Sequence, residues 1–549
     1  MTQTIKVSEI PVPDFIKGPD PKGMLIGGEW TQAQSAETFQ TVNPATGSVL
    51  ATIASGGAAD VDRAVAAARR LFEKPSWADM NPHERTLVLL RIADAIEANG
   101  EELATLESLD GGIPITLTRG MVADAAKTVR YYAGWPTKIM GAVNPVDASV
   151  HCYTVREPLG VCAGIIPWNG PLTMAVWKIA PALACGNTVI LKPAEQTPLT
   201  ALRFGEILAE TGLPDGVVNI VTGFGETAGA AIAGHMAIDK VSFTGSTATG
   251  KQILHASVAN LKRVTLELGG KSPHIIMPDA DIGAAARNAA AGFVMLTGQV
   301  CVAGTRILVQ ESILDEFASE LAKAVTAFRI GDPLEEETML GPVVSAEQFE
   351  RVNSYVSIGV GEGAQLALGG GRFDSPGYFV EPTVFTGVRN DMRLAREEIF
   401  GPVAALMPFR GVDEAVRIAN DTEYGLAAAV ATSNVSTAHT VARKLRAGVV
   451  WVNTYSELDA TFPFGGYKQS GIGRELGDKS LEGFTELKSV FIRLWTLTPR
   501  AVIGTVRRSV RKDATLCLPT PVPRFAGKSA ATGRSSIAPW PIPGRVRSW

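Results

Sequence analysis

Cys301 is the residue whose type and surroundings first suggest chemistry. It lies in GQVCVAGTR (298–306) and is flanked by Val300 and Val302. The default interpretation of a cysteine in an apolar run is a buried structural thiol, which would be inert. As a thiolate it would instead be a nucleophile, and that chemistry needs a base and a donor for the oxyanion that forms.

Two polar residues in apolar stretches could supply that base and that donor. Glu267 lies between two leucines in TLELGGKSP (265–273), and burial there would raise its pKa towards the range useful for a general base. Asn169, in IPWNGP (166–171), carries a side-chain amide. Taken alone, Glu267 could be ion-paired and Asn169 could be a turn residue. Together with Cys301 they favour catalysis.

Two glycine-containing turns between strands and helices could bind phosphate. GFGETA (223–228) fits the pattern GxGxxG/A of dinucleotide-binding turns, but such turns are frequent in α/β proteins and the signal is weak. FTGSTATG (243–250) could bring Ser246 and neighbouring amides to a phosphate at a helix N-terminus. The alternative for the second turn is an ordinary helix cap by Ser246 or Thr247.

Lys192 and Glu195, in LKPAE (191–195), follow a predicted buried strand. Such strand ends are where open α/β sheets bind ligands. A carboxylate there would accept hydrogen bonds from ribose hydroxyls and repel a 2′-phosphate, so Glu195 favours NAD over NADP. The alternative is a solvated salt bridge in a loop.

The elements that carry these residues alternate between strands and helices. Predicted helices 61–72, 83–99 and 120–135 come first. Strands 188–191, 217–221 and 240–243 then alternate with helices 199–211, 226–234 and 247–254. A second block, 282–453, contains helices 314–328, 346–360, 413–420 and 437–445 and ends on strand 449–453. This alternation predicts βαβ units around parallel sheets, which is an α/β fold.

Composition limits the classes of function. The 549 residues are 46% apolar and 19% charged, which is typical of a globular chain of two or three domains. The net charge is −4, so no overall positive field favours nucleic acid. The five cysteines and six histidines lack ligand or disulfide spacing. We therefore expect no metal, no disulfide framework and a reducing compartment.

The C-terminal segment differs from the rest of the chain. From Ile492 to Trp549 there are eleven Lys or Arg and one acid, Asp513. Residues after Leu497 are rich in Pro and Ser without a period, which predicts a basic, disordered tail. The tail could be a mobile arm for an acidic partner or a membrane surface, or it could be non-native sequence such as a shifted reading frame. We favour the second interpretation.

No segment predicts a secretory signal or a membrane span. The N-terminus lacks an apolar signal core. The uncharged stretch from Leu159 to Trp177 is interrupted by PWNGP (167–171), which would serve a lipid-facing helix poorly. We expect buried strands and turns there, and a cytoplasmic protein.

Seven motifs occur in order along the chain: PWNGPL, LKPAEQTP, FTGSTATG, LELGGKSP, GQVCVAGTR, EEIFGPV and PFGGYKQSGIGRELG. Together they resemble the aldehyde dehydrogenase superfamily, and the earlier LIGGEW (25–30) and NPATG (43–47) fit it too. The resemblance spans roughly Leu25 to Val490. The chain is identified as a member of that superfamily, of the hydrolytic, NAD(P)-dependent type.

The resemblance implies a role for each catalytic candidate. Cys301 would attack the aldehyde, giving a thiohemiacetal and then a thioester, while Asn169 and the backbone N–H of Cys301 hold the oxyanion. Glu267 would activate the water that hydrolyses the thioester. Members that transfer the acyl group to coenzyme A lack this glutamate, so hydrolysis is favoured. Lys178 and Glu475 match a proton relay behind the base, with a plain ion pair as the alternative.

The resemblance also implies the cofactor site, for NAD with NADP possible. The adenosine ribose would contact Lys192 and Glu195. The pyrophosphate would bind chiefly at the turn of Gly245 and Ser246. The interpretation of the glycine turn at 223–228 as the phosphate-binding turn is therefore only partly supported. The full set of candidate contacts is Ile166, Trp168, Lys192, Glu195, Gly225, Gly245, Ser246, Leu268, Gln348, Arg351, Glu398 and Phe400.

The substrate pocket departs from the family at one position. The family often has Phe where this chain has Gly170, which would enlarge the pocket beside the oxyanion hole. The other wall candidates are Trp177, Met295, Val300, Val302, Phe462 and Phe464, and core packing is the alternative for each. An apolar wall predicts an aliphatic or aromatic aldehyde. Glu457 and Asp459 could attract a cationic aminoaldehyde or be loop surface, and apart from Arg306 no Arg stands near for a substrate carboxylate.

The implied fold is a Rossmann-like NAD-binding domain (1–138 and 158–268), an α/β catalytic domain (269–480) and a small β oligomerisation segment (139–157 and 481–495), before the tail 496–549. Strands near 142–156 and 484–492 would build the subunit contacts of a dimer or tetramer. The alternatives are a CoA-acylating dehydrogenase, against which Glu267 argues, and a catalytically silent structural member of the fold. The intact set of Cys301, Glu267 and Asn169 argues against the silent member.

Overall fold

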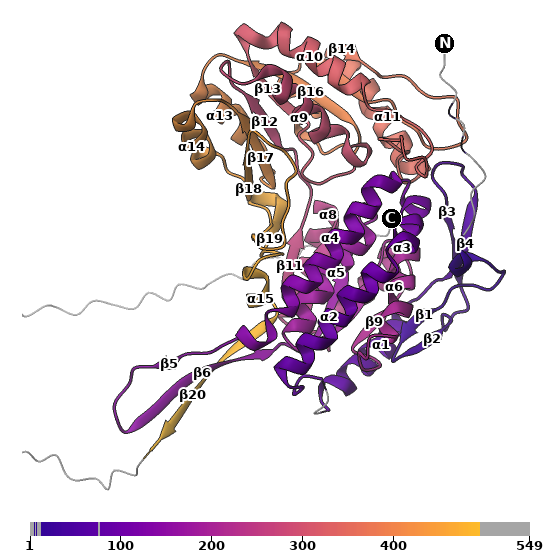
Figure 1. Cartoon of the computed structure of the whole chain (residues 1–549), viewed down its shortest axis with the longest axis vertical. Helices are drawn as coiled ribbons and strands as arrows, with labels where there is room; N and C mark the ends of the chain where they lie inside the picture. Colours follow the sequence, from indigo (N-terminus) through magenta and orange to yellow (C-terminus); the bar gives the residue numbers. More distant parts are fainter. Residues whose placement is uncertain (1–4, 6, 8–12, 75–76, 495–549) are drawn as a thin grey trace, which may run out of the picture. The chain divides into compact units, whose positions relative to one another are not determined.

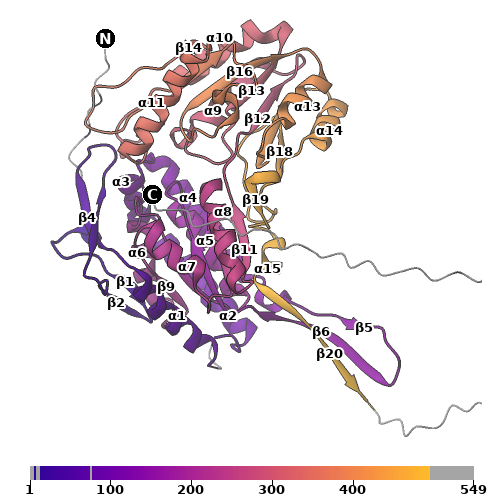
Figure 2. The same cartoon turned by 180° about the vertical axis from the view of Figure 1, so that it is seen from behind.

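The structure contains two large sheets, and several of the predicted cofactor residues lie at the ends of the strands of the first one. This computed structural model describes residues 5, 7, 13–74 and 77–494 (Figures 1 and 2). The described residues up to Arg493 form one compact unit. The predicted disordered tail, 496–549, and Cys517 within it lie outside the described residues.

The first sheet has eight strands in the order β19-β11-β10-β7-β8-β9-β1-β2. The strands from β11 to β9 are parallel, while β19, β1 and β2 pair antiparallel with their neighbours. All residues of β7, β8 and β10 are buried, as expected for a parallel sheet covered on both faces. The bounds are β1 Met24–Ile26, β2 Glu29–Thr31, β7 Val161–Ile165, β8 Thr188–Lys192, β9 Val218–Ile220, β10 Lys240–Thr244, β11 Arg263–Glu267 and β19 Gly471–Ile472.

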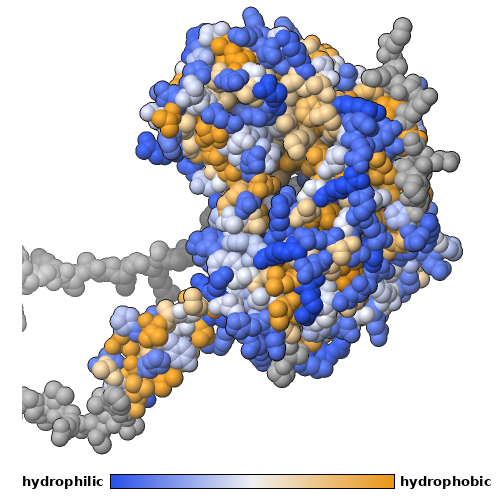
Figure 3. All heavy atoms as spheres, viewed as in Figure 1, coloured by the Kyte–Doolittle hydropathy of each residue, from blue (hydrophilic) through white to orange (hydrophobic). Residues whose placement is uncertain are grey.

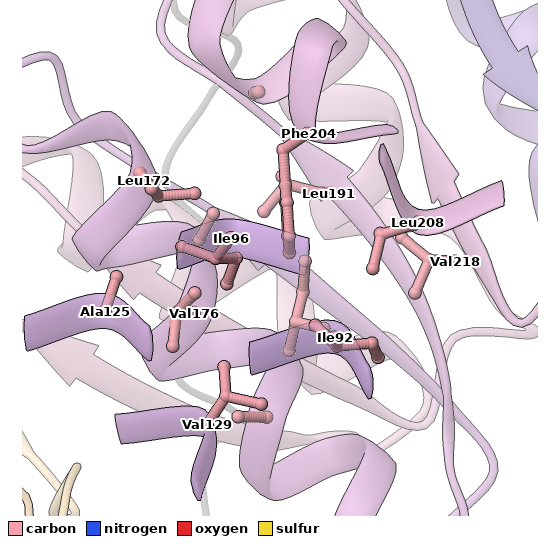
Figure 4. Close-up of a cluster of buried hydrophobic side chains, with 14 of the residues drawn as sticks. Ile92, Ile96, Ala125, Val129, Leu172, Val176, Leu191, Phe204, Leu208 and Val218 are labelled. Atoms are coloured by element: carbon pink, nitrogen blue, oxygen red, sulfur yellow. The ribbon is translucent and has the colours of Figure 1, made fainter. Parts of the chain in front are cut away.

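Helices cover both faces of this sheet. One face packs against α1 (Ala58–Phe72), α7 (Ala230–Gly234) and α8 (Thr247–Ala256). The other face packs against α5 (Pro171–Ala184) and α6 (Leu199–Ala209), and a further layer of α2 (Pro82–Ala98), α3 (Gly100–Gly111) and α4 (Ile115–Ala133) packs on those two helices. Figure 4 shows part of this core, where Ile92, Val129, Val176 and Leu191 come from four different elements.

The second sheet has seven strands in the order β14-β15-β16-β13-β12-β17-β18, all parallel except β14. Its strands are β12 Pro273–Ile276, β13 Arg306–Gln310, β14 Gln365–Leu368, β15 Thr383–Thr386, β16 Val403–Phe409, β17 Ala427–Ala431 and β18 Val449–Val452. Helices α9 (Ile282–Val294) and α10 (Leu314–Thr326) pack on one face. The other face packs against α11 (Ala346–Gly361), α12 (Arg393–Arg396), α13 (Val412–Asn420) and α14 (Val435–Lys444).

Smaller elements complete the unit. A three-stranded antiparallel sheet, in the order β20-β6-β5, is formed by β5 (Val143–Asn144), β6 (Val150–Pro158) and β20 (Thr485–Arg493). Apolar side chains gather on its surface, among them the exposed Val143, Leu487 and Phe491 (Figure 3). A hairpin of β3 (Thr38–Val42) and β4 (Val49–Ala54), the short helix α15 (Lys479–Glu482) and several short 3₁₀ helices also belong to it.

The predicted α/β fold class is confirmed, and the predicted helices and strands occur with shifted ends. The predicted helix 120–135, for example, begins earlier, at Ile115. The prediction of strands and turns over 159–177 is wrong in its second half, because helix α5 starts at Pro171. Proline is tolerated at the first helical position, where its missing N–H would have no partner. Among the described residues, no helix is long and apolar enough to cross a bilayer.

Candidate active site

The loop that carries Cys301 joins α9 to β13. It follows a tight turn, Met295–Gly298, in which three successive residues have positive φ. A Cβ on Gly298 would lie 2.2 Å from the carbonyl carbon of Gly401, so a side chain has no room there. Burial, together with the charges of Glu398 and Glu267, raises the pKa of the Cys301 thiol to about 12.

Glu267 is the last residue of β11, and only 2% of its surface is exposed. In the part of the chain that the structure describes, neither of its carboxylate oxygens has a hydrogen-bond partner. Burial and the negative charge of Glu475 therefore raise its pKa well above the usual range. A carboxyl group with a raised pKa can accept and release a proton at higher pH, as a general base must.

A buried ion pair lies next to this carboxyl group. Lys178, from α5, pairs with Glu475, and their side chains are 1% and 3% exposed. The Lys178 Nζ also donates to Thr244 Oγ1 (2.6 Å), and the Ser242 hydroxyl donates to Glu475 Oε1 (2.9 Å). The plain ion pair that the sequence allowed is present, while the proton relay stays a prediction.

Asn169 is tied to the loop before Cys301. Its Nδ2 donates a hydrogen bond to the carbonyl oxygen of Gln299 (2.8 Å), two residues before Cys301 in the chain. An amide nitrogen carries two hydrogens, so one remains for a substrate oxygen. The contact thus joins the segment before α5 to the loop that carries Cys301.

The cofactor candidates of the first sheet lie beyond neighbouring strands. At the end of β8, Lys192 Nζ donates to Glu195 Oε2 (3.1 Å) and to the carbonyl oxygen of Pro193 (3.0 Å), and burial lowers the lysine pKa. After β10, Ser246 caps α8 by accepting a hydrogen bond from the backbone N–H of Thr249 (3.1 Å). The helix cap named as an alternative is therefore present, and so is a Lys192–Glu195 salt bridge, although it is not solvated as expected, because the lysine is buried at the end of β8.

This edge of the sheet fits a dinucleotide. After β9, Gly225 begins a π-helical turn, and a Cβ built on it would meet nothing within 4 Å. A carboxylate, a lysine and the N-terminus of α8 stand at the carboxyl ends of β8 and β10, where open α/β sheets bind ligands. Carboxylates accept hydrogen bonds from ribose hydroxyls, and helix N-termini donate to phosphate.

A second group of cofactor candidates surrounds the loop Glu398–Phe400. Glu398 Oε1 accepts a hydrogen bond from the backbone N–H of Gly270 (2.9 Å), and burial raises its pKa to about 7. Phe400 meets Trp168 edge to face, with ring centroids 5.5 Å apart. Gln348 Nε2 donates to the Phe400 carbonyl oxygen (2.7 Å) and Arg351 Nη2 to that of Glu398 (2.6 Å). Both residues support the loop, and their direct contact with ribose stays a prediction.

Three more candidates are held by backbone hydrogen bonds. The N–H of Gly245 donates to the carbonyl oxygen of Glu267 (3.0 Å), and the N–H of Leu268 donates to that of Ser470 (2.9 Å). The N–H of Ile166 donates to the carbonyl oxygen of Lys192 (3.1 Å). The first of these bonds connects the turn after β10 to Glu267 at the end of β11, and the third connects the ends of β7 and β8.

Most pocket candidates gather with Cys301 in one apolar cluster, namely Trp177, Val300, Val302, Phe462 and Phe464. The rings of Trp177 and Phe464 lie 5.4 Å apart. Met295 and Gly170 are not members of this cluster. A Cβ on Gly170 would lie 3.2 Å from Cε of Met121, so Gly170 faces α4. The sequence missed the other members, which are Met174, Leu426, Ala427, Ala429, Val449, Trp451, Tyr455 and Leu476.

Arg306 is unavailable to a substrate carboxylate. It is fully buried, and its guanidinium donates to the carbonyl oxygens of Lys271, Ile418 and Ala419 (3.0, 3.0 and 2.7 Å). Glu457 and Asp459 are exposed. Within the described ranges, no three His, Cys, Asp or Glu are grouped to hold a metal, and the four described cysteines are free.

Comparisons with known proteins relate this geometry to a family. Residues 30–490 match the Aldehyde dehydrogenase family. The chain is 50% identical to aldehyde dehydrogenase 1A1 of Gallus gallus over 474 residues, 86% of this chain and 93% of that protein. It is 48% identical to an aldehyde dehydrogenase of Emericella nidulans over 495 residues, 90% of this chain and 99% of that protein.

Solved structures agree. The NAD+ complex of aldehyde dehydrogenase from Bacillus cereus matches with a TM-score of 0.87 at 47% identity, over 90% of this chain and 100% of that one. The fold and these matches define an oxidoreductase that acts on aldehydes. The chain belongs to the aldehyde dehydrogenase family. The predicted family, fold and enzyme class are confirmed, while the predicted domain boundaries and residue roles stay predictions.

Proposed function

We propose that this protein oxidises an aldehyde to a carboxylic acid with NAD, through a thioester on Cys301. The observation that carries the proposal is the Glu267 carboxyl group, which is buried without a hydrogen-bond partner among the described residues and lies close enough to Cys301 for the charges of the two groups to interact. A lone buried carboxylate is costly to a folded protein, and such groups concentrate at active sites.

In the first half-reaction the Cys301 thiol releases its proton to solvent, and its sulfur bonds to the aldehyde carbon. The carbonyl oxygen takes the negative charge, and the amide of Asn169 and the backbone N–H of Cys301 donate to it. Losing one such donor typically lowers the rate ~10²–10³-fold. When bound, NAD accepts the hydride that leaves the thiohemiacetal carbon, which turns that carbon into a thioester.

In the second half-reaction Glu267 takes a proton from water, and the resulting hydroxide attacks the thioester carbon. The acid leaves, and the Cys301 thiol is restored. Lys178 and Glu475, next to the base, would pass the proton on. Because Glu267 supplies the base, hydrolysis is favoured over transfer to coenzyme A.

NAD would bind with its adenosine ribose at Lys192 and Glu195 and its pyrophosphate at Ser246. Gly225, Gly245 and Leu268 would line the same path, and Ile166 would lie along it. Trp168, Glu398 and Phe400 would hold the nicotinamide end, with the loop fixed by Gln348 and Arg351. The Glu195 carboxylate would disfavour the 2′-phosphate of NADP.

The apolar cluster around Cys301 supports an aliphatic or aromatic aldehyde as substrate. The exposed apolar residues of β5 and β20 support a dimer or tetramer built through this sheet. The free thiols of the four described cysteines support a cytoplasmic location.

The test mixes the protein with NAD and a panel that includes propanal and benzaldehyde, with and without coenzyme A, and follows NADH by absorbance. We expect NADH without coenzyme A, and none from Cys301→Ala. NADH formation that required coenzyme A would support the acyl-transferring alternative, and none under any condition would support a silent member. Equal use of NAD and NADP would remove the role given to Glu195.

A further inference from the structure

Helix α3 carries two buried acids one turn apart, Glu107 and Asp110. Both are 0% exposed, and neither pairs with a basic side chain in the part of the chain that the structure describes. Burial raises the pKa of each to about 7. Unpaired buried carboxyl groups are costly, and each of these two holds another part of the chain by a hydrogen bond.

Glu107 holds the first turn of α5. Its Oε1 accepts a hydrogen bond from the backbone N–H of Leu172 (2.7 Å). The helix cannot cap itself, because its N-cap residue is Gly170, without a side chain, and the next residue is Pro171, without an N–H. Glu107 therefore caps α5 from another helix. The capped helix begins just after Asn169 in the chain.

The side chain of Leu172 holds the same turn by packing into the core. It is fully buried in the core between the first sheet and the outer helices, near Val176 of the same helix (Figure 4). The start of α5 is thus held at its backbone by Glu107 and at its side chain by packing. Because Asn169 precedes this turn by two residues, its position is held as well. Its amide donates a hydrogen bond to the carbonyl oxygen of Gln299.

Asp110 holds the segment after Glu195 in an analogous way. Its Oδ2 accepts a hydrogen bond from the backbone N–H of Leu199 (3.0 Å), the first residue of α6. Its Oδ1 is hydrogen-bonded to the Thr41 hydroxyl, which lies 3.2 Å from the carbonyl oxygen of Gln196. Asp110 therefore holds one end of the turn Gln196–Leu199 directly, and the other end indirectly through Thr41.

We propose that Glu107 and Asp110 are positioning residues that act on different halves of the active site. Glu107 fixes the oxyanion donor Asn169 through α5, and Asp110 fixes the ribose acceptor Glu195 through the turn before α6. The inference rests on the proposed function, which assigns those roles to Asn169 and Glu195. One helix, α3, thus sets both the reacting centre and the adenosine end.

The test separates the two residues by kinetics in the full-length protein, with propanal as the probe aldehyde. Glu107→Leu should lower kcat about tenfold, a part of the ~10²-fold or greater loss expected when an oxyanion donor is removed, and leave the KM for NAD within about twofold. Asp110→Leu should raise the KM for NAD about fivefold and change kcat little. Each variant is the matched control of the other.

Conservative variants distinguish positioning from general damage. Glu107→Gln and Asp110→Asn keep an oxygen that accepts the same backbone hydrogen bond, so both should recover most of the wild-type kinetics. In a double-mutant cycle, Glu107→Leu should add little to Asn169→Ala, because the two changes remove one interaction. Should either leucine variant fail to fold, Glu107→Asp and Asp110→Glu take its place and should show the same split.

NAD binding, followed by calorimetry, gives a readout that does not require turnover. Asp110→Leu should weaken NAD binding about fivefold, and Glu107→Leu should leave it unchanged. The proposal would be overturned if Glu107→Leu and Asp110→Leu changed kcat by the same factor and NAD affinity by the same factor. Additive effects of Glu107→Leu and Asn169→Ala on kcat would overturn it as well. Absence of NADH formation by the wild type would instead refute the proposed function, with the binding comparison still decisive for Asp110.

Discussion

Thr244 and Glu267 are paired residues on β10 and β11, and the Thr244 hydroxyl accepts a hydrogen bond from Lys178. The strand pairing therefore brings the buried Lys178–Glu475 ion pair next to the candidate base. Parallel pairing also puts both residues at the carboxyl ends of their strands, where the cofactor candidates begin. The chemistry of the site depends on this register.

Glu267→Gln should separate the two half-reactions. The amide cannot take a proton from water, so acylation would continue while hydrolysis falls ~10²–10⁴-fold, the range that a general base typically contributes. Rapid mixing with NAD and propanal should then show a burst of about one NADH per active site, followed by slow turnover. Glu457→Gln, at an exposed position, is the control and should behave as the wild type. Steady turnover without a burst in Glu267→Gln would contradict the role of the base.

The pH dependence should report the same carboxyl group. Burial raises the pKa of Glu267 well above 4.5, and the base works only when deprotonated. Turnover should therefore fall as the pH drops through a value well above 4.5, and the rate above that value should be flat until another group titrates. The profile of kcat against pH checks this, provided hydrolysis limits turnover. An acid limb near 4.5 would show that the carboxyl group is hydrated in solution.

The Lys178–Glu475 pair should matter for stability as well. Lys178→Met would leave Glu475 buried and uncompensated, which costs about 3–5 kcal/mol of the free energy of unfolding. The double variant Lys178→Met/Glu475→Leu should lose less than the sum of the single changes. Urea unfolding measures these values, and the exposed pair Asp124–Lys127 is the control, where Lys127→Met should cost less than about 1 kcal/mol. An equal loss of unfolding free energy in Lys178→Met and Lys127→Met would contradict the burial of the Lys178–Glu475 pair.

Gly170 faces α4 and lies outside the cluster around Cys301, so its predicted effect on substrate size has to act through Met121 and the neighbouring Asn169. The Gly170 φ of 179° is extended backbone that any residue adopts, so Phe would fit the chain but would press on Met121, which lies 3.2 Å from the position of a Cβ. Gly170→Phe should lower kcat/KM for benzaldehyde about tenfold relative to propanal. Gly170→Ala, the control, should leave that ratio within about twofold. An unchanged ratio in Gly170→Phe would remove Gly170 from the pocket.

Local sequence patterns predicted the regular helices and strands of the fold. Helices such as α10 and strands such as β8 have regular apolar spacing, and their predicted starts match the structure. Helix α5 was missed because it is apolar on all sides and contains Pro181, so no amphipathic period marks it. That helix carries Trp177 and Lys178, which only the resemblance identified.

Long-range contacts explain what else the sequence could not show. Gln348 and Arg351 act on backbone oxygens about fifty residues later in the chain, and nothing in their own segment indicates it. The hydrogen bonds of Glu107 and Asp110 likewise join α3 to helices that follow much later. Side-chain types at Cys301, Glu267 and Asn169 suggested chemistry, but their grouping follows from strand order and turn geometry.

The central claim is that the substrate is joined to Cys301 as a thioester. The direct measurement is mass spectrometry of Glu267→Gln, mixed with NAD and benzaldehyde and quenched with acid. We predict a benzoyl group on the peptide that contains Cys301, dependent on NAD and absent from Glu267→Gln/Cys301→Ala. NADH formed without that adduct, or with the benzoyl group on another residue, would contradict the account.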